Sequence, residues 1–276
     1  MSKEKIVKIL TDKKVYFMGL GLLAVVFLIQ LYFLLNQAHI LPSVKNCNVQ
    51  GIKLYGGLYT YKNGASDGTG QLSKDVASSE DITAAIEKAN KDSSIKAILL
   101  QVDSSGGSPV GGWEIAEALK HSNKPTVALI RERGDSAAYL SASGAKYVIA
   151  SANSDVGSIG VTMSYLGNVD KNTTDGLTFY ELSEGKFKDA GNPDKVLTQE
   201  EGDLFMRDVK VLYNNFVKYV SENRHMDIKK VTELADGSSM LGQMAKDNGL
   251  IDQVGGIYDA EVYLKKQIKT NVNICW

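Results

Sequence analysis

The sequence is poor in the residues that build several common kinds of site. It has 2 cysteines, 4 prolines and 3 histidines in 276 residues, and no C-x-x-C spacing that would indicate a zinc site. Two cysteines are too few for a disulfide-rich scaffold, so a hydrophobic core must hold the chain together, and its length is ample for one. An excess of one charge is also lacking, since the chain has 31 Lys and Arg residues and 32 Asp and Glu residues. This balance argues against a general nucleic-acid binder.

Nucleotide-binding loops are absent as well. Neither G-x-x-x-x-G-K-[ST] nor G-x-G-x-x-G occurs in the sequence, and these are the patterns that cradle phosphates in the common nucleotide-binding folds. We therefore expect no nucleotide, no metal and no other cofactor.

The mean hydropathy of −0.14 conceals a long apolar run near the N-terminus. Residues 15–35 read VYFMGLGLLAVVFLIQLYFLL, and about 21 residues at ~1.5 Å each make a helix as long as the hydrocarbon core is thick. The preceding tail, 1–14, carries five lysines and two acidic residues, and the next charged residue is Lys45. The asymmetry predicts a cytoplasmic tail, a single transmembrane helix in the cell (cytoplasmic or inner) membrane, a linker at 36–48 and an extracytoplasmic domain at 49–276.

A cleaved signal peptide is the alternative interpretation of the apolar run. Its apolar region would span about 7–15 residues and would precede a small-residue cleavage site. Here the run is longer, and the sequence NQAHI at 36–40 offers no convincing A-x-A site. The uncleaved anchor is therefore favoured, and a buried core helix is disfavoured because no polar face interrupts the run.

Beyond the linker, strand-like and helix-like segments alternate. The continuous apolar run at 95–102 is typical of a strand buried on both faces, and apolar residues at i, i+3, i+4 and i+7 predict a helix at 81–92. The remaining predicted segments are strands near 51–61, 126–130 and 147–151 and helices near 110–121 and 136–143. Their order predicts an α/β domain with a mainly parallel sheet, and the polar stretch 66–79 predicts a loop.

The last third of the chain is predicted to be helical. Thr198 and Glu201 form a capping-box pattern, in which each side chain caps the other residue's backbone N–H. The helix that they begin carries one broad apolar face, made of Leu204, Val209, Leu212, Phe216 and Val220. That face is either part of the core or a contact between copies of the chain, and the core interpretation is favoured.

Three loops rich in small residues are candidates for a site of acyl transfer. The first, 103–108, directly follows the buried strand, at the edge where parallel sheets bind ligands; its glycines could aim N–H groups at an oxyanion, or simply make a tight turn. The second, 133–139, contains Ser136 at a helix start, where a serine is either an exposed nucleophile or an N-cap. The third, 156–161, has glycines that suit a bend.

A nucleophilic serine needs a base. His39, His121 and His225 all lie outside the small-residue loops, so a Ser-His-Asp triad is weakly supported. A lysine serves instead if burial lowers its pKa by disfavouring the ammonium form. The segment 184–191 contains two candidates, Lys186 and Lys188.

Together the loops resemble the Ser–Lys signal peptide peptidase family, membrane-bound serine peptidases of the Clp protease/crotonase superfamily. The matching motifs are DSSGGS at 103–108, DSAAY at 135–139, GSIGV at 157–161, GKFKD at 185–189 and LGQMAKDNGLIDQVGG at 241–256. The resemblance covers roughly residues 51–264. It implies a Clp protease/crotonase-like repeated β-β-α superhelix with C-terminal helices, behind the N-terminal transmembrane helix.

The resemblance also implies roles for individual residues. Ser136 matches the nucleophile and Lys188, the second lysine of its motif, matches the general base. Ser158 matches the serine that orients the lysine amine. The backbone N–H groups implied for the oxyanion hole are those of Gly107 (or Gly106) and Ala137.

The function implied is that of a membrane-anchored serine endopeptidase that needs no metal. The family resemblance implies peptide substrates, namely remnant signal peptides or other apolar membrane-associated peptides, and a homo-oligomer whose sites combine neighbouring subunits. Two other functions stay open: a catalytically silent scaffold, and a crotonase-like enzyme that polarises an acyl thioester with Gly106 and Gly107. The predicted location disfavours the second, because coenzyme A is cytoplasmic. Cys47 and Cys275 either pair or stay free.

Overall fold

The structure is a computed structural model that describes residues 13–37, 47–62 and 76–276. It divides into two units, Met1–Asn46 and Cys47–Trp276. Most of the predicted tail 1–14, most of the predicted linker 36–48 and residues 66–75 of the predicted loop lie outside the described residues.

The described residues of the first unit, 13–37, form the helix α2 (Lys13–Gln37), of 25 residues. It includes the whole apolar run, and its described apolar side chains, such as Leu22 and Leu34, are exposed. Among the residues that the structure describes, no helix meets the length and apolarity expected of a membrane span. The transmembrane anchor therefore stays a prediction.

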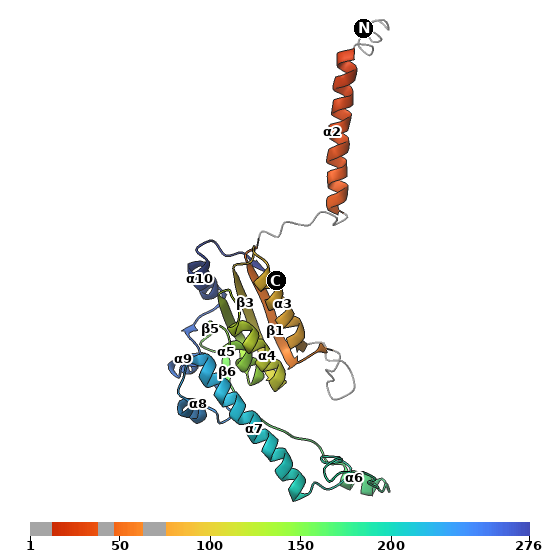
Figure 1. Cartoon of the computed structure of the whole chain (residues 1–276), viewed down its shortest axis with the longest axis vertical. Coiled ribbons are helices and arrows are strands. Elements are labelled where there is room, and N and C mark those ends of the chain that lie inside the picture. The colour runs from red at the N-terminus through yellow and green to blue at the C-terminus, as the bar shows by residue number, and fades with distance from the viewer. Residues whose placement is uncertain (1–12, 38–46, 63–75) are drawn as a thin grey trace. The chain divides into compact units, whose positions relative to one another are not determined.

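The second unit is built on a nine-stranded sheet, whose main path runs β2-β1-β3-β4-β5-β8 (Figure 1). Its strands are β1 (Val49–Tyr59), β2 (Val76–Ser78), β3 (Ala97–Gly107), β4 (Thr126–Asp135), β5 (Tyr147–Ala150), β6 (Asp155–Gly157), β7 (Ser239–Leu241), β8 (Gln253–Val254) and β9 (Ile274–Cys275). Its helices are α3 (Ser79–Lys91), α4 (Pro109–Lys120), α5 (Ala137–Ser143), α6 (Val169–Thr174), α7 (Gln199–Arg224), α8 (Ile228–Leu234), α9 (Gly242–Asp247) and α10 (Ile257–Ile268). Every strand pair is parallel except β6 with β7. The prediction of an α/β domain with a mainly parallel sheet is confirmed.

Apolar side chains cover both faces of the sheet, because the first parts of β3 and β4, 97–102 and 126–130, are apolar at nearly every position. On one face, Leu100 packs in a cluster with residues of α3, α4 and α5, among them Ile86 and Ile115. On the other face, Leu99 packs with Ala260 and Leu264 of α10. Burial on both faces accounts for the continuous apolar run that predicted β3.

Two strands continue past the ends that their apolar runs predict. β3 extends to Gly107, because Gly106 and Gly107 pair with Gly57 and Leu58 of β1. β4 extends to Asp135, which pairs with Gly157 of the short strand β6. The predicted loop at 103–108 is therefore mostly strand. The ladder partners come from other segments, and a local apolar pattern does not reveal them.

Helix α7 begins at the predicted capping box. Glu201 N–H donates to Thr198 Oγ1 at 3.3 Å, and Thr198 N–H donates to Glu201 Oε2 at 2.9 Å. Its apolar face, however, is divided: Phe216 and Val220 are buried in the core, whereas Leu204, Val209 and Leu212 are half-exposed. The core interpretation is correct only for the second half of the helix.

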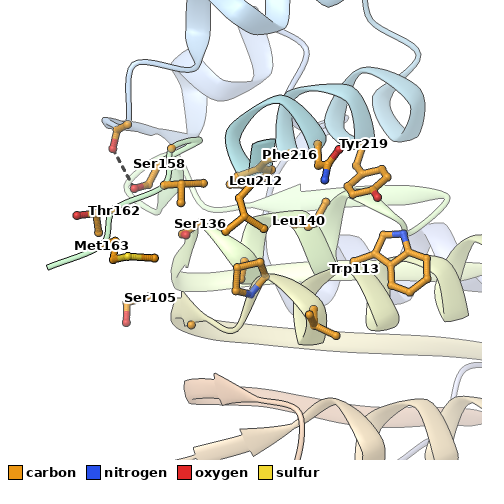
Figure 2. A pocket seen from close by; sticks show the side chains of 18 residues that line it. Ser105, Trp113, Ser136, Leu140, Ser158, Thr162, Met163, Leu212, Phe216 and Tyr219 are labelled. Carbon is orange, nitrogen blue, oxygen red and sulfur yellow. Dashed lines mark hydrogen bonds between the residues drawn. The ribbon is translucent and has the colours of Figure 1, made fainter. Parts of the chain in front are cut away.

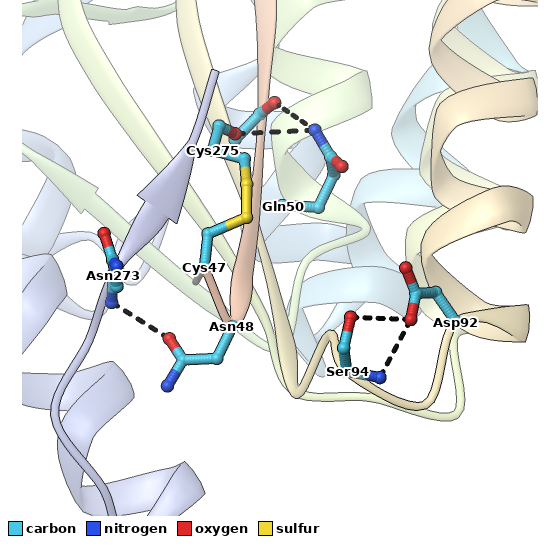
Figure 3. The surroundings of a disulfide bond; sticks show 8 residues. Cys47, Asn48, Gln50, Asp92, Ser94, Asn273 and Cys275 are labelled. Atoms are coloured by element: carbon cyan, nitrogen blue, oxygen red, sulfur yellow. Dashed lines mark hydrogen bonds between the residues drawn. A yellow bond between two sulfur atoms is a disulfide. The ribbon is translucent and has the colours of Figure 1, made fainter. Parts of the chain in front are cut away.

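A disulfide joins the two ends of the second unit, Cys47 and Cys275 (Figure 3). The strand that contains Cys275, β9, pairs with the start of β1. The Trp276 ring lies over Gly51, where a Cβ would come within 2.5 Å of it. The disulfide and the strand pairing together fasten the C-terminal segment to the first strand of the sheet.

Candidate active site

Ser136 occupies a strained turn between β4 and α5. Its φ of 54° and ψ of −127° lie outside the regions that residues with a side chain normally adopt. Strain of this kind costs about 1–3 kcal/mol and is concentrated at functional sites. Although Ser136 stands at the N-cap position of α5, its side chain makes no capping hydrogen bond. The interpretation of Ser136 as an N-cap is therefore wrong, and its hydroxyl is free for another role.

The Ser136 side chain lines a cavity of about 780 Å³, which is within the range of small-molecule and peptide subsites. Figure 2 shows its polar part, where Ser105, Ser136, Ser158 and Thr162 gather, and its aromatic end, where Trp113 lies beside Tyr219. The rings of these two residues are 6.4 Å apart. The cavity thus combines a hydroxyl-rich end with an apolar wall.

Ser158 lines the same cavity from the loop after β6. It too has a positive φ, of 48°, and its Oγ donates a hydrogen bond to Gly237 O at 3.0 Å (Figure 2). That bond uses the only proton of the hydroxyl and leaves the oxygen lone pairs as acceptors. Ser158 is therefore able to accept an N–H from an amine placed in the cavity.

The two candidate glycines differ in what their N–H groups do. Gly106 N–H already donates to Ser104 Oγ at 3.1 Å. Ser108 N–H points toward β1, where it bonds Leu58 O at 2.7 Å. Gly107 lines the cavity, which makes it the better placed of the two candidates.

Ala137, the other candidate donor, is the first residue of α5. N–H groups in the first turn of a helix have no partner within the helix. Ala137 lines the cavity together with Gly107 and Ser136. A Cβ on Gly106 would come within 2.9 Å of Ala137 N and 2.8 Å of Ser136 Cβ, so the end of β3 lies directly against the start of α5.

A buried carboxyl adjoins the nucleophile. Asp135 Oδ1 is buried without a hydrogen-bond partner, and Arg133 Nε lies 3.4 Å from Oδ2. Burial and then the nearby Asp155 carboxylate raise the pKa of Asp135, and Arg133 opposes them. Among the described residues, no group of three or more His, Cys, Asp or Glu side chains is placed to hold a metal ion.

Lys188, the candidate base, is not brought to this cavity by its own chain. It is exposed, in the segment between α6 and α7, and it is absent from the residues that line the cavity. Figure 1 shows α6 near the start of α7 and well apart from α5. The structure therefore brings together Ser136, Ser158, Gly107 and Ala137, and it leaves Lys188 elsewhere.

Ion pairs hold the segment around Lys188 to the first turn of α7. Lys186 pairs with Glu200 at 2.8 Å, and Lys195 pairs with Glu201 at 3.0 Å. The cavity, in contrast, meets α7 from Leu212 onward. Glu201 and Leu212 are eleven positions apart, which is about 16 Å of helix. A lysine side chain beside Glu201 is too short to cover that distance to the cavity.

The apolar wall of the cavity was not recognised from the sequence. Leu212 and Phe216 were assigned to a core or oligomer face, but they line the cavity with Tyr219 and with Trp113 of α4. The i, i+4 spacing of Leu212 and Phe216, continued by an aromatic residue three positions later, was the available signal. It does not distinguish a pocket wall from core.

The fold and the site define a class: an α/β protein with a strained serine at a strand-to-helix turn, backbone N–H groups beside it and a cavity around it. Residues 118–271 match the model of peptidase family S49, and the chain belongs to this family.

Known proteins from distant organisms are similar to this chain. It is 34% identical to a putative protease of Methanocaldococcus jannaschii, over 63% of this chain and 57% of that protein. It is 32% identical to a putative signal peptide peptidase SppA of Enterococcus faecium, over 75% and 62%, and 31% identical to protease 4 of Haemophilus influenzae, over 69% and 31%. The chain thus spans about three fifths of the length of the first two.

Among solved structures, a mutant of ClpP1 from Listeria monocytogenes is similar, with a TM-score of 0.49 and 12% identity over 76% of this chain and 92% of that one.

Proposed function

We propose that this chain is a membrane-anchored serine endopeptidase in which Ser136 of one copy is activated by Lys188 of a neighbouring copy. The observation that carries the proposal is the placement of a strained, uncapped Ser136 in a cavity beside the Gly107 and Ala137 N–H groups. Membership of peptidase family S49 supports the reaction type. The proposed fold type is the repeated β-β-α superhelix of Clp proteases and crotonases.

The proposed reaction has two halves. A neutral Lys188 amine takes the proton of Ser136 Oγ, which attacks the peptide carbonyl carbon, and the resulting oxyanion accepts hydrogen bonds from Gly107 and Ala137. The C–N bond then breaks, the lysine ammonium protonates the leaving amine, and an ester forms on Ser136. In the second half, Lys188 deprotonates a water that attacks the ester carbonyl carbon, the C–O bond to Ser136 breaks, and the lysine ammonium returns the proton to Ser136 Oγ. Ser158 Oγ accepts an N–H of the amine and orients it.

The exposed surface of the chain supports a second copy as the source of Lys188. We call residues 160–215, all of which the structure describes, the arm; Glu201 is its one buried residue. Large apolar side chains of the arm lie open to solvent: Met163, Tyr165, Leu166, Leu177, Phe179, Tyr180, Leu182, Phe187, Val196, Leu197, Met206 and Val211. So many exposed large apolar side chains in one segment indicate an interaction site. A contact between copies would cover it and bury Lys188, which favours the neutral amine.

Two features support the proposed location. The apolar run at 15–35 and the lysine-rich tail before it predict a single-pass anchor with the second unit outside the cytoplasm. The disulfide between Cys47 and Cys275 fits an oxidising compartment. Apolar, membrane-associated peptides such as remnant signal peptides are the proposed substrates, since the wall of Trp113, Leu212 and Phe216 suits apolar side chains.

The test of the chemistry compares peptide hydrolysis by the full-length protein with three variants. Ser136→Ala and Lys188→Ala are expected to lower kcat by about 10³-fold or more, as removal of a catalytic nucleophile or base does in serine peptidases. Lys186→Ala is the matched control, because this lysine lies in the same segment and pairs with Glu200, and it is expected to stay largely active. Full activity of either of the first two variants would reject the dyad.

A second experiment separates the peptidase from a silent scaffold. A serine-directed acylating probe is expected to label Ser136 in the wild type, with no labelling of Ser136→Ala. An unreactive Ser136 in the assembled protein would favour the scaffold. The location is tested by topology reporters at the C-terminus, and a cytoplasmic C-terminus would overturn the proposed orientation.

A further inference from the structure

A cluster of carboxylates surrounds one lysine in the arm, next to the start of α7. The Lys195 ammonium lies 2.9 Å from Glu181 Oε2 and 3.0 Å from Glu201 Oε1, with Asp189 Oδ2 at 3.8 Å. Hydrogen bonds to Glu181 and Glu201 raise the pKa of Lys195. The lysine is thus kept charged and joins three points of the chain.

Glu201 connects this cluster to the start of α7. Its side chain is only 6% exposed. One oxygen, Oε2, accepts hydrogen bonds from Thr198 N and Oγ1 at 2.9 and 3.1 Å, while Oε1 faces Lys195. Both carboxylate oxygens are therefore occupied, and the segment that carries Glu181, Asp189 and Lys195 is fixed to the first turn of a 26-residue helix.

Lys188 differs from the other lysines of this segment. Lys186 pairs with Glu200, and Lys195 pairs with Glu181 and Glu201. Lys188 stands between them, next to Asp189, and in the described part of the chain its ammonium has no hydrogen bond or ion pair. An ammonium held by a carboxylate is a poor base, because the carboxylate stabilises the charged form. The cluster thus fixes both sides of Lys188 and leaves its amine free.

We propose that Lys195 is a positioning residue: held by Glu181 and Glu201, it fixes the segment so that Lys188 is presented to the Ser136 cavity of a neighbouring copy. The inference rests on the proposed Ser–Lys chemistry and adds the ion-paired residues that fix the position of the base. It assigns to the Glu201 capping residue a second task, which is to anchor the base-carrying segment.

The first test uses homogeneous full-length variants. Lys195→Met keeps most of the side-chain stem and removes the charge, so kcat is expected to fall about 10- to 100-fold, the range that a displacement of about 1 Å produces. KM is expected to stay within about twofold, because the cavity is built by other residues. Lys195→Arg, which keeps the charge, is expected to recover most of kcat. Lys186→Met is the control, because both side chains of the Lys186–Glu200 pair are exposed and an exposed pair contributes little to holding the segment; kcat is expected to stay nearly unchanged.

The second test asks which copy needs Lys195. Co-expressed Ser136→Ala and Lys188→Ala chains are expected to form sites in which the first supplies the lysine and the second the serine. Lys195→Met on the Ser136→Ala chain is expected to abolish most of that activity, whereas the same change on the Lys188→Ala chain is expected to have little effect. A general loss of stability would act equally from both chains.

The outcomes separate the two proposals. If Lys188→Ala is inactive while Lys195→Met keeps full kcat, or if both placements in the mixture act equally, the positioning role is overturned and the dyad stands. If Lys188→Ala keeps its activity, the dyad fails and the positioning role fails with it. If the mixture is inactive, the site does not cross between copies, and the proposal that Lys195 presents Lys188 to a neighbouring copy is overturned.

Discussion

The two halves of the proposed dyad lie in regions of opposite character. All seven residues of α5, which follows Ser136, are buried, and the strands beside it are packed on both faces. In the arm, which carries Lys188, Glu201 is the one buried residue among 56 described positions. The nucleophile is fixed by the packing of its own chain, whereas the base is held by ion pairs, local hydrogen bonds and a helix cap. The contrast indicates that the arm reaches its final environment only in an assembly.

Matched glycine substitutions give the largest expected difference between the two regions. Gly107→Ala would place a Cβ 2.1 Å from Leu58 O, at a φ of +146°. Strain and overpacking of about 1–3 kcal/mol each are expected to lower the free energy of unfolding by about 2–6 kcal/mol. Gly176→Ala in the arm, with a φ of +70° and open space around it, is expected to cost about 1–2 kcal/mol. Urea unfolding measures both, and equal costs would contradict the contrast.

Loss of the disulfide is expected to have the next largest effect. A bond between residues 228 positions apart restricts the unfolded chain, and removal of such a bond costs about 2–5 kcal/mol. Cys47→Ser with Cys275→Ser is expected to lower the free energy of unfolding in urea by that amount and to speed amide exchange in β1 and β9. Exchange in the arm is expected to stay the same. An unchanged free energy of unfolding would show that strand pairing alone fastens the C-terminal segment.

A smaller effect is expected at Asp135. Burial and the nearby Asp155 raise the pKa of Asp135 in the folded chain. The folded chain therefore favours the protonated carboxyl. The stability that the protonated carboxyl contributes is lost as the pH rises through the pKa of the folded state. Asp135→Asn is expected to add about 1 kcal/mol to the free energy of unfolding at pH 7, which is about what a buried polar group without a hydrogen bond costs. The gain is expected to vanish below about pH 4.

The control for that prediction lies in the arm. Asp175→Asn, at an exposed position, is expected to change the free energy of unfolding by less than about 0.5 kcal/mol at either pH. A gain for Asp135→Asn that persists at low pH would show that the raised pKa is not its cause.

The smallest effect on folding is expected at the most exposed apolar residue of the arm. Leu182 is 98% exposed, so Leu182→Asp is expected to leave the free energy of unfolding within about 0.5 kcal/mol. Its effect is expected on assembly instead: light scattering should show a shift to smaller species, with a matching loss of activity. Tyr258→Asp, a change on α10 outside the arm, is expected to leave the assembly intact. An unchanged assembly with Leu182→Asp would remove the arm from the contact.

The same contrast explains what the sequence could predict. The apolar runs of β3 and β4 and the stripe of α3 predicted the sheet and its helices, because burial in one chain imposes a local pattern. Thr198 and Glu201 predicted the start of α7, because a capping box is made by hydrogen bonds between residues three positions apart. The division of the α7 face between core and half-exposed positions was not predictable, since its first half and its second half carry similar residues.

The site was predictable as a set of residues and not as a geometry. The motif at 135–139 pointed to Ser136, but the positive φ that distinguishes it from an N-cap depends on β6, which binds its backbone N–H through Gly157 O at 2.7 Å. The choice between Gly107 and Gly106 likewise depends on the hydrogen bond that Gly106 N–H donates to Ser104 Oγ. Lys188 was identified by its motif. The family resemblance implied sites that combine neighbouring subunits, but no local pattern in the sequence indicated that Lys188 lies away from Ser136 of its own chain.

The most direct test of the account is the distance from Ser136 Oγ to Lys188 Nζ in an experimental structure of the assembled, full-length protein. The account predicts about 2.6–3.2 Å, the reach of a general base, between a serine of one copy and a lysine of its neighbour. A Lys188 that contacts Ser136 of its own chain, or an assembly that leaves every Lys188 in solvent, would contradict it.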